Sequence, residues 1–193
     1  MGDLWQFTKI SCMEEFTFNK VLDKFYGHGI AGLVRENIQN SLDGKLQGNN
    51  EPVVVNIQIG SINKEDIPGL DEVKARINCL KGKNSYTKET IRYMQDKMND
   101  DIVNYISFED SNTKGLAGAI HGQTDDPKDT WSIYAYNKGV HGEEEDEELE
   151  KSRGGSHGIG KIASNSASDL YMMYFANCDA YGNQHLGGTV QLI

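Results

Sequence analysis

The stretch that decides the fold spans residues 35–43 and has the sequence Arg35-Glu36-Asn37-Ile38-Gln39-Asn40-Ser41-Leu42-Asp43. Neither proline nor glycine occurs between Leu33 and Asp43, so the stretch predicts a helix. On a helix, Glu36, Asn40 and Asp43 follow one another at i, i+4 and i+7 and therefore share one face. A carboxylate one turn before a carboxamide suits two tasks: it can polarise a water molecule, and it can offer oxygen to Mg²⁺. An ordinary polar helix face is the alternative.

The other side of the predicted helix is apolar. We expect this side to dock the helix on a core. Its residues are Val34, Ile38 and Leu42.

The composition is that of a soluble globular protein, with 193 residues, 37% hydrophobic and 25% charged. Of the net charge of −10, seven negative charges lie in the run 143–150, and the rest of the chain carries −3. The chain has no stripe of basic residues of the kind that would indicate nucleic-acid binding. Cys12, Cys79 and Cys178 are far apart, which favours reduced thiols over disulfides or a zinc site. The N-terminal residues show neither a basic n-region nor an apolar h-region, and no run approaches membrane-spanning length, so we expect a cytoplasmic protein.

Periodicity and turn residues predict an alternation of helices and strands. We expect helices at 14–26, 33–43, near 70–80, at 88–98 and at 162–166, and strands at 52–59, 102–108, 131–136, 169–176 and 188–193. The segment 61–100 is predicted to be an insertion, and 117–154 a lid-like connection. The glycines of 27–32 match a dinucleotide fingerprint, but that motif needs a preceding strand, and the chain has a predicted helix there. A joint between two helices is the better interpretation.

A second informative stretch is the glycine cluster that precedes the predicted helix at 162–166. Glycines spaced in this way let backbone N–H groups approach a phosphate. Gly155 to Lys161 fits GxxxxGK, the start of a P-loop, yet Ile162 stands where that loop needs Ser or Thr for Mg²⁺. The metal ligand must then come from elsewhere, and Asn40 is our candidate. The cluster comprises Gly155, Ser156, His157, Gly158, Ile159, Gly160 and Lys161.

The third stretch follows the predicted strand at 102–108. Asp110 can accept a hydrogen bond from an exocyclic amine such as that of adenine, although Asp at a strand end is more often a turn former. Asn112, Gly115 and Leu116 follow it.

Together, and in this order, the three stretches resemble the GHKL (Bergerat-fold) ATPases, which include gyrase B-type topoisomerases, ninety-kilodalton heat-shock chaperones, MutL, MORC proteins and histidine kinases. The first box, Glu-x-x-x-Asn-(Ala/Ser)-x-Asp, is matched by Glu36, Asn40, Ser41 and Asp43. The second, Asp-x-Gly-x-Gly, is one residue longer here. It is matched by Asp110, Asn112 and Gly115. The third, Gly-x-x-Gly-x-Gly, is matched by Gly155, Gly158 and Gly160.

The resemblance implies an α/β (α+β) two-layer sandwich, with a mixed, mostly antiparallel sheet and helices on one face. It implies that Glu36 is the general base, that Asn40 ligates Mg²⁺, and that Asp110 recognises adenine. The backbone of 155–160 would wrap the phosphates of ATP, with Lys161 adding positive charge. We expect one ATP-binding domain over 1–193.

The resemblance also implies slow, Mg²⁺-dependent ATP hydrolysis that drives a conformational and dimerisation cycle, with effector regions outside this domain. Histidine kinases usually carry Asn at the position of Glu36, so a hydrolase is favoured over a kinase. A module that binds ATP without hydrolysing it is the other alternative. The family's last box is a Gly-Thr pair. Gly188-Thr189 is expected to lie instead in the final hairpin, which puts that box beyond Ile193 and makes the chain the N-terminal part of a longer protein.

Overall fold

The computed structural model describes residues 4–7, 29–118, 128–136, 162–179 and 181–192. These residues form a mixed α/β structure that divides into two compact units. One unit contains 57–107 with the N-terminal residues 4–7, and the other contains 29–56 and the described residues of 108–191. The predicted insertion 61–100 falls within the first unit, and the first two family boxes fall within the second.

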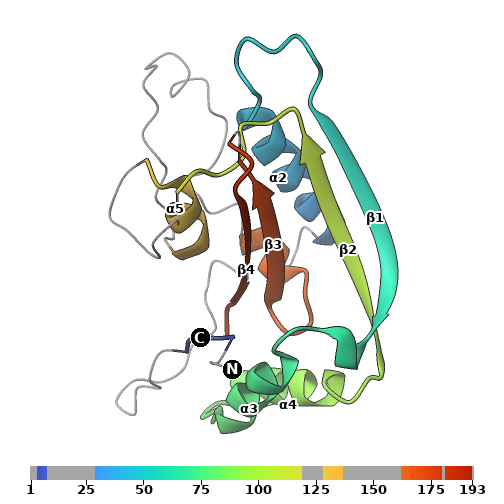
Figure 1. Cartoon of the computed structure of the whole chain (residues 1–193). Helices are drawn as coiled ribbons and strands as arrows, with labels where there is room; N and C mark the ends of the chain where they lie inside the picture. Colours follow the sequence, from blue (N-terminus) through green and yellow to red (C-terminus); the bar gives the residue numbers. More distant parts are fainter. Residues whose placement is uncertain (1–3, 8–28, 119–127, 137–161, 180, 193) are drawn as a thin grey trace. The chain divides into compact units, whose positions relative to one another are not determined.

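Two ten-residue strands form one of the sheets. β1 (Val54–Asn63) pairs with β2 (Ile102–Ser111) in a two-stranded sheet, and Figure 1 shows the two strands running in opposite directions. A bond beyond the end of the pair agrees with this: the backbone N–H of Lys64, just after β1, donates to the carbonyl of Asp101, just before β2, at 2.8 Å. Both strands extend beyond the predicted 52–59 and 102–108 at their C-terminal ends, so Asp110 lies inside β2 rather than after it.

Helices α3 (Leu70–Cys79) and α4 (Ser85–Lys97) pack on each other in the first unit. Apolar side chains at helical spacing drive this packing, because each helix turns one stripe inward. The buried side chains are Leu70, Val73, Ile77, Leu80, Ile91, Met94 and Met98. Asn84 caps α4 by accepting a 2.8 Å bond from the N–H of Thr87. The predictions near 70–80 and at 88–98 are confirmed, with α4 starting three residues earlier.

The second unit begins with α2 (Gly29–Asp43), which confirms the predicted helix at 33–43 and extends it toward the N-terminus. Gly29 and Gly32 belong to this helix, so the expected joint at 27–32 is wrong for 29–32; Gly27 and His28 lie outside the described residues. The predicted helix at 14–26 also lies outside them.

The predicted docking face of α2 is wrong. Ile38 and Leu42 remain 36% and 53% exposed, whereas Leu33 and Ser41 are buried. Ser41 can be buried because its hydroxyl donates to the carbonyl of Asn37 at 3.0 Å, within the helix itself. The inward face of α2 therefore consists of positions 33, 37 and 41. The predicted face, at 34, 38 and 42, lies one residue further along the helix.

A β-hairpin forms the other strand pair of the second unit. β3 (Met172–Cys178) pairs antiparallel with β4 (Gln184–Val190), from Met172 opposite Val190 to Cys178 opposite Gln184. The predicted strands at 169–176 and 188–193 are confirmed in kind but shifted. Gly188 and Thr189 lie within β4, as expected of the hairpin's second strand.

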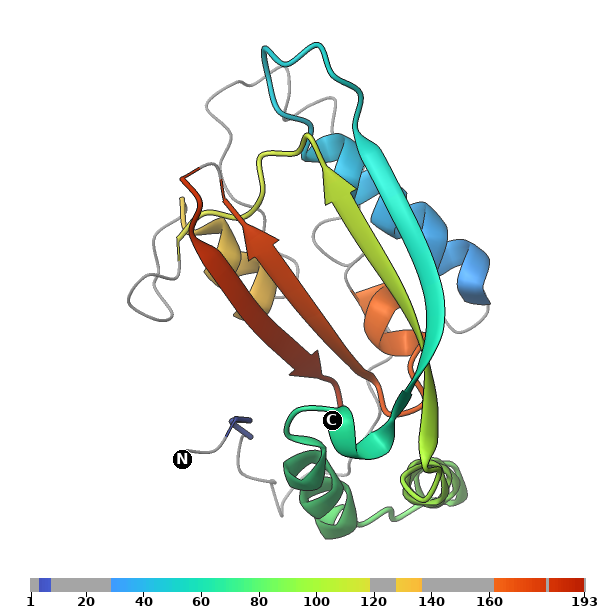
Figure 2. The ribbon, with the colours of Figure 1, turned by 45° about the vertical axis from the view of Figure 1, so that its right-hand side comes forward.

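The hairpin packs against α5 (Thr130–Tyr136), as Figure 2 shows. The Trp131 ring lies 5.1 Å from the Phe175 ring and 5.0 Å from the His185 ring, centroid to centroid. Gly187, opposite Phe175, makes room for these rings: a Cβ there would lie 3.1 Å from Phe175 and 3.2 Å from Trp131.

The predicted strand at 131–136 is wrong, because those residues form α5. Buried Asp129 explains the helix: its carboxylate accepts the N–H of Ser132 at 2.8 Å and the hydroxyl of Ser132 at 2.7 Å. This is an N-cap, which outweighs the β preference of Trp, Ile and Tyr.

The short helix α7 (Ile162–Ser166) agrees with the predicted 162–166 and contacts both α2 and β3. Its Asn165 is fully buried. The Asn165 Nδ2 lies 2.9 Å from the carbonyl of Tyr171 and 3.1 Å from that of Thr189. The hydroxyl of Thr189 donates to Asn165 Oδ1 at 3.3 Å. The side chain of Asn165 therefore fastens α7 to the open end of the hairpin.

Within the described ranges the sheets are two separate strand pairs, β1–β2 and β3–β4. None of the helices found there is both long and apolar enough to cross a membrane.

Candidate functional site

The first box lies on α2, as a continuous helix over Glu36, Asn40 and Asp43. The side chain of Glu36 is 16% exposed, and its Oε1 forms a 3.2 Å ion pair with Arg35 Nη2, whose own side chain is 69% exposed. Asn40 is exposed, and within the described part of the chain its amide makes no hydrogen bond. Asp43 Oδ1 accepts a 2.7 Å bond from Gln39. The amide oxygen of Asn40 is thus accessible, while Asp43 is held by its own helix.

The second box lies at the end of β2 and in the turn that follows it. Asp110 is exposed, and its Oδ1 accepts a 3.0 Å bond from the Thr113 hydroxyl. Asn112 has a φ of 63° and Gly115 a φ of 66°, both in the left-handed region. Asn tolerates this region better than most residues, so Asn112 can adopt the backbone conformation that the box would assign to a glycine.

Backbone hydrogen bonds bring these two boxes together. The N–H of Lys114 donates to the carbonyl of Gly44 at 2.8 Å, and the N–H of Leu46 donates to the carbonyl of Asn112 at 3.1 Å. These bonds make an antiparallel bridge between Lys45 and Thr113. The Asn112 side chain adds a 2.7 Å bond to the carbonyl of Pro52. The C-terminal end of α2 is therefore joined to the turn after Asp110, while Glu36 lies about two helical turns further back.

A further contact comes from a residue that the sequence analysis missed. The Asn177 side chain, on β3, accepts from the N–H of Leu116 at 2.7 Å and donates to its carbonyl at 2.6 Å. The two residues are 61 positions apart, and an isolated Asn near a strand end carries no signal that could have indicated the pairing.

Tyr134 of α5 is electrostatically linked to the same box. Burial, with a smaller contribution from the negative charge of Asp110, raises the pKa of Tyr134 to about 12. Tyr134 also packs edge-on against Phe175, with ring centroids 5.1 Å apart. This phenol therefore remains protonated at neutral pH, on the helix that covers the hairpin.

The third box lies outside the described residues, as do the predicted contacts of Gly155, Ser156, His157, Gly158, Ile159, Gly160 and Lys161. Most of the predicted lid at 117–154 does as well. The helix α7, which begins at Ile162, is described: Ser164 lies 3.4 Å from the Asn37 amide, one residue after Glu36.

In the portions of the chain that are described, no three His, Cys, Asp or Glu side chains gather into a metal site. A Mg²⁺ ion held by Asn40 would take its other oxygen ligands from water and phosphate, as Mg²⁺ commonly does.

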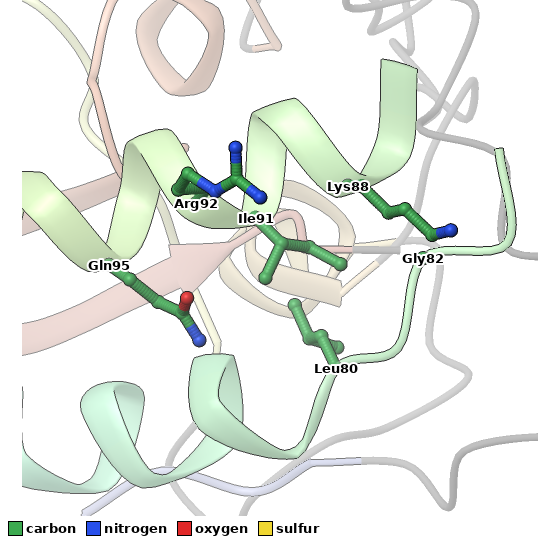
Figure 3. Close-up of a pocket in the computed structure, with 6 residues that line it drawn as sticks. All are labelled: Leu80, Gly82, Lys88, Ile91, Arg92 and Gln95. Carbon is green, nitrogen blue, oxygen red and sulfur yellow. The ribbon is translucent and has the colours of Figure 1, made fainter. Parts of the chain in front are cut away.

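An open cleft of about 260 Å³ lies in the other unit and contains none of the predicted site residues. Figure 3 shows Leu80 and Ile91 beside the cationic side chains Lys88 and Arg92, with Gln95 and Gly82 completing the lining.

Comparison with known proteins gives no match to a family model, to a curated protein or to a solved structure.

Proposed function

We propose that this chain is an ATP-binding domain of the Bergerat type that hydrolyses ATP slowly with Mg²⁺. Its α/β sandwich would hold the nucleotide between helices and lid. By resemblance, the cycle would include lid closure and ATP-dependent dimerisation in the cytoplasm, and would drive an effector outside this segment.

One observation carries the proposal: the backbone bridge between Lys45 and Thr113. A metal-binding carboxamide and an adenine-reading carboxylate must serve one nucleotide, although 70 positions separate Asn40 from Asp110. The bridge joins the segment just after Asp43 to the turn just after Asp110. The proposed metal ligand and the proposed adenine acceptor need to lie near each other, and this bridge brings their segments together. If the first box were an ordinary polar helix face and Asp110 an ordinary turn former, no bridge between their segments would be required.

The chemistry of the exposed groups fits the proposed roles. Asn40 offers an amide oxygen that accepts no bond within the described chain, and amide oxygen is a hard ligand of the kind that Mg²⁺ prefers. Bound Mg²⁺ would neutralise charge on the phosphates. Asp110 keeps Oδ2 for the exocyclic amine of adenine while Oδ1 accepts from Thr113. Glu36 would orient and deprotonate the attacking water.

The position of α7 supports a role for the glycine cluster. The chain passes from Lys161 directly into this helix, whose Ser164 meets Asn37. The predicted phosphate-binding segment therefore ends next to a helix that contacts the helix of Glu36 and Asn40.

Calorimetric titration of the chain with ATP and Mg²⁺ tests the proposal through Asp110→Asn. This change keeps an oxygen for Thr113 but replaces the adenine acceptor, so the ATP affinity should fall by about tenfold or more. Glu109→Gln is the matched control, because adjacent residues of a strand point to opposite faces. The proposal fails if the unmodified chain does not bind Mg-ATP, or if the two variants bind it equally.

A second candidate, the module that binds ATP without hydrolysing it, is favoured by the ion pair of Glu36 with Arg35 at 3.2 Å. A carboxylate oxygen engaged in this way is less available to a water molecule. Phosphate release in the steady state by the full-length protein separates the two candidates, since a sensor would bind ATP and release none.

A further inference from the structure

The turn that follows Asp110 needs external support because of its backbone. Asn112 and Gly115 both adopt left-handed conformations, at φ of 63° and 66°. Glycine adopts this region without strain, but a non-glycine residue such as Asn112 persists there only where surrounding contacts determine it. Asp110 lies near the end of β2 and accepts a bond from Thr113 in this turn, so whatever holds the turn also bears on the position of the Asp110 carboxylate.

Contacts from the segment after α2 support only the first half of the turn. The bonds from Leu46 and to Gly44 and Pro52 reach Asn112 and Lys114. Leu116, at the far end, receives no bond from that segment among the described residues.

Among the described residues, the bonds to Leu116 itself come from the Asn177 side chain, while the next residue, Ala117, bonds Thr130 and Trp131 of α5. One carboxamide accepts from the N–H of Leu116 at 2.7 Å and donates to its carbonyl at 2.6 Å. The approach is so close that a Cβ at Gly115 would lie 2.8 Å from Asn177 Oδ1 and 3.0 Å from the Cys178 carbonyl. Position 115 thus requires glycine for two reasons: its φ is left-handed, and β3 lies too close for a side chain.

We propose that Asn177 is a positioning residue for nucleobase recognition, fixing Gly115 and Leu116 so that Asp110 meets the exocyclic amine. This inference rests on the proposed function and deepens it by adding the source of base selectivity. Asn177 touches no ligand itself; it acts through the turn.

The consequence is a preference for adenine over guanine that depends on β3. Guanine presents a carbonyl oxygen where adenine presents its amine, and a carboxylate repels it. A site built to bond a given group rejects an analogue that lacks it, provided that the site is held in place. Loosening the turn should therefore affect base discrimination more than phosphate binding.

The test compares Asn177→Ala with the unmodified chain and with Asn183→Ala. Asn183 is a matched control because its side chain bonds Asp179 in the turn of the same hairpin, at 2.9 Å. Affinities for Mg-ATP, Mg-GTP and Mg-tripolyphosphate are measured by calorimetry. For Asn177→Ala we expect about a tenfold weaker affinity for ATP, an ATP-to-GTP ratio that falls toward one, and a tripolyphosphate affinity unchanged within about twofold. Asn183→Ala should keep the unmodified ratio.

Equal losses for all three ligands would mean a purely structural role and would overturn the inference, as would an unchanged ratio in a folded Asn177→Ala chain. If that variant does not fold, ¹⁵N-labelled unmodified chain decides: adenosine should shift the Asn177 amide resonances and tripolyphosphate should not. The absence of an adenosine shift overturns the inference. Failure of the unmodified chain to bind ATP would instead remove the proposed function, so the two failures are distinguishable.

Discussion

Lys114 donates its backbone N–H to the carbonyl oxygen of Gly44 at 2.8 Å. This bond ties the residue after Asp43 to the residue before Gly115, and so joins the ends of two motifs that lie far apart in sequence. Each part of the proposed site can be tested separately, because the metal, the base and the water would be handled by different side chains.

Replacing Glu36 by Gln should abolish hydrolysis and spare binding. Gln keeps the size of the side chain but cannot accept a proton, and loss of a general base typically costs on the order of 10²- to 10⁴-fold in rate. Phosphate release and ATP affinity are measured on the full-length protein, with Glu51→Gln as a control on an exposed loop carboxylate. Hydrolysis at the unmodified rate would exclude Glu36 as the base.

Replacing Arg35 by Gln should have a small effect. Arg35 is exposed, and exposed ion pairs contribute about 0–1 kcal/mol, so release of Glu36 should raise the hydrolysis rate by no more than about fivefold. Single-turnover measurements give this rate. A fall of a hundredfold would instead show that the guanidinium itself takes part in the reaction.

Replacing Asn40 by Ala should weaken the binding of Mg-ATP by about tenfold or more, which corresponds to about 1.4 kcal/mol. The effect should vanish when EDTA removes the metal, because the lost oxygen is a metal ligand in this proposal. Titrations with and without Mg²⁺ make the comparison. The same loss in both conditions would assign Asn40 to the nucleotide rather than to the metal.

Replacing Asn165 should lower the free energy of unfolding more than replacing its partner Thr189 does. The buried Asn165 side chain bonds Tyr171 and Thr189 at the open end of the hairpin. Asn165→Ala removes all of these bonds, at a cost of about 2–3 kcal/mol in the free energy of unfolding. Thr189→Val removes only the hydroxyl contact, at about 1 kcal/mol. Urea unfolding measures both values, and equal losses would contradict the assigned role of the amide.

Acid should destabilise the hairpin turn through Asp179. Its carboxylate accepts bonds from the Asn183 side chain and from the N–H groups of Tyr181 and Asn183, and these bonds hold its pKa below the ordinary 3.8. Because the folded pKa is the lower one, this contribution to stability is complete above pH 3.8 and is lost as the pH falls below it. The melting temperature of Asp179→Asn should therefore fall less between pH 5 and pH 3 than that of the unmodified chain, about as expected for one carboxyl group. Identical falls would refute the assignment.

Elements whose local signals agree could be predicted from sequence. The helix α7 was expected at its observed bounds, and the helix of Glu36 and Asn40, α3, α4 and the strands were each expected within several residues. In these segments apolar periodicity and turn residues favour the same structure.

The predictions failed where a polar group that is buried, or distant in sequence, determines the local structure. α5 has a strand-like composition and becomes a helix because Asp129 caps it. The inward face of α2 includes Ser41, whose hydroxyl is satisfied within the helix, so hydrophobicity alone pointed to the wrong side. Asn177 reaches across 61 positions to Leu116, and no local pattern encodes that bond.

The tight space at Gly187 carries a consequence for how this chain can change over time. A Cβ at 187 would lie 3.1 Å from Phe175 and 3.2 Å from Trp131, so even alanine there requires these rings to shift by a few tenths of an ångström. A descendant with alanine at 187 should therefore carry a compensating change at 175 or 131 more often than one that keeps glycine. These three positions are expected to covary, which gives a signature for tracing distant homologues even after the nucleotide motifs have diverged.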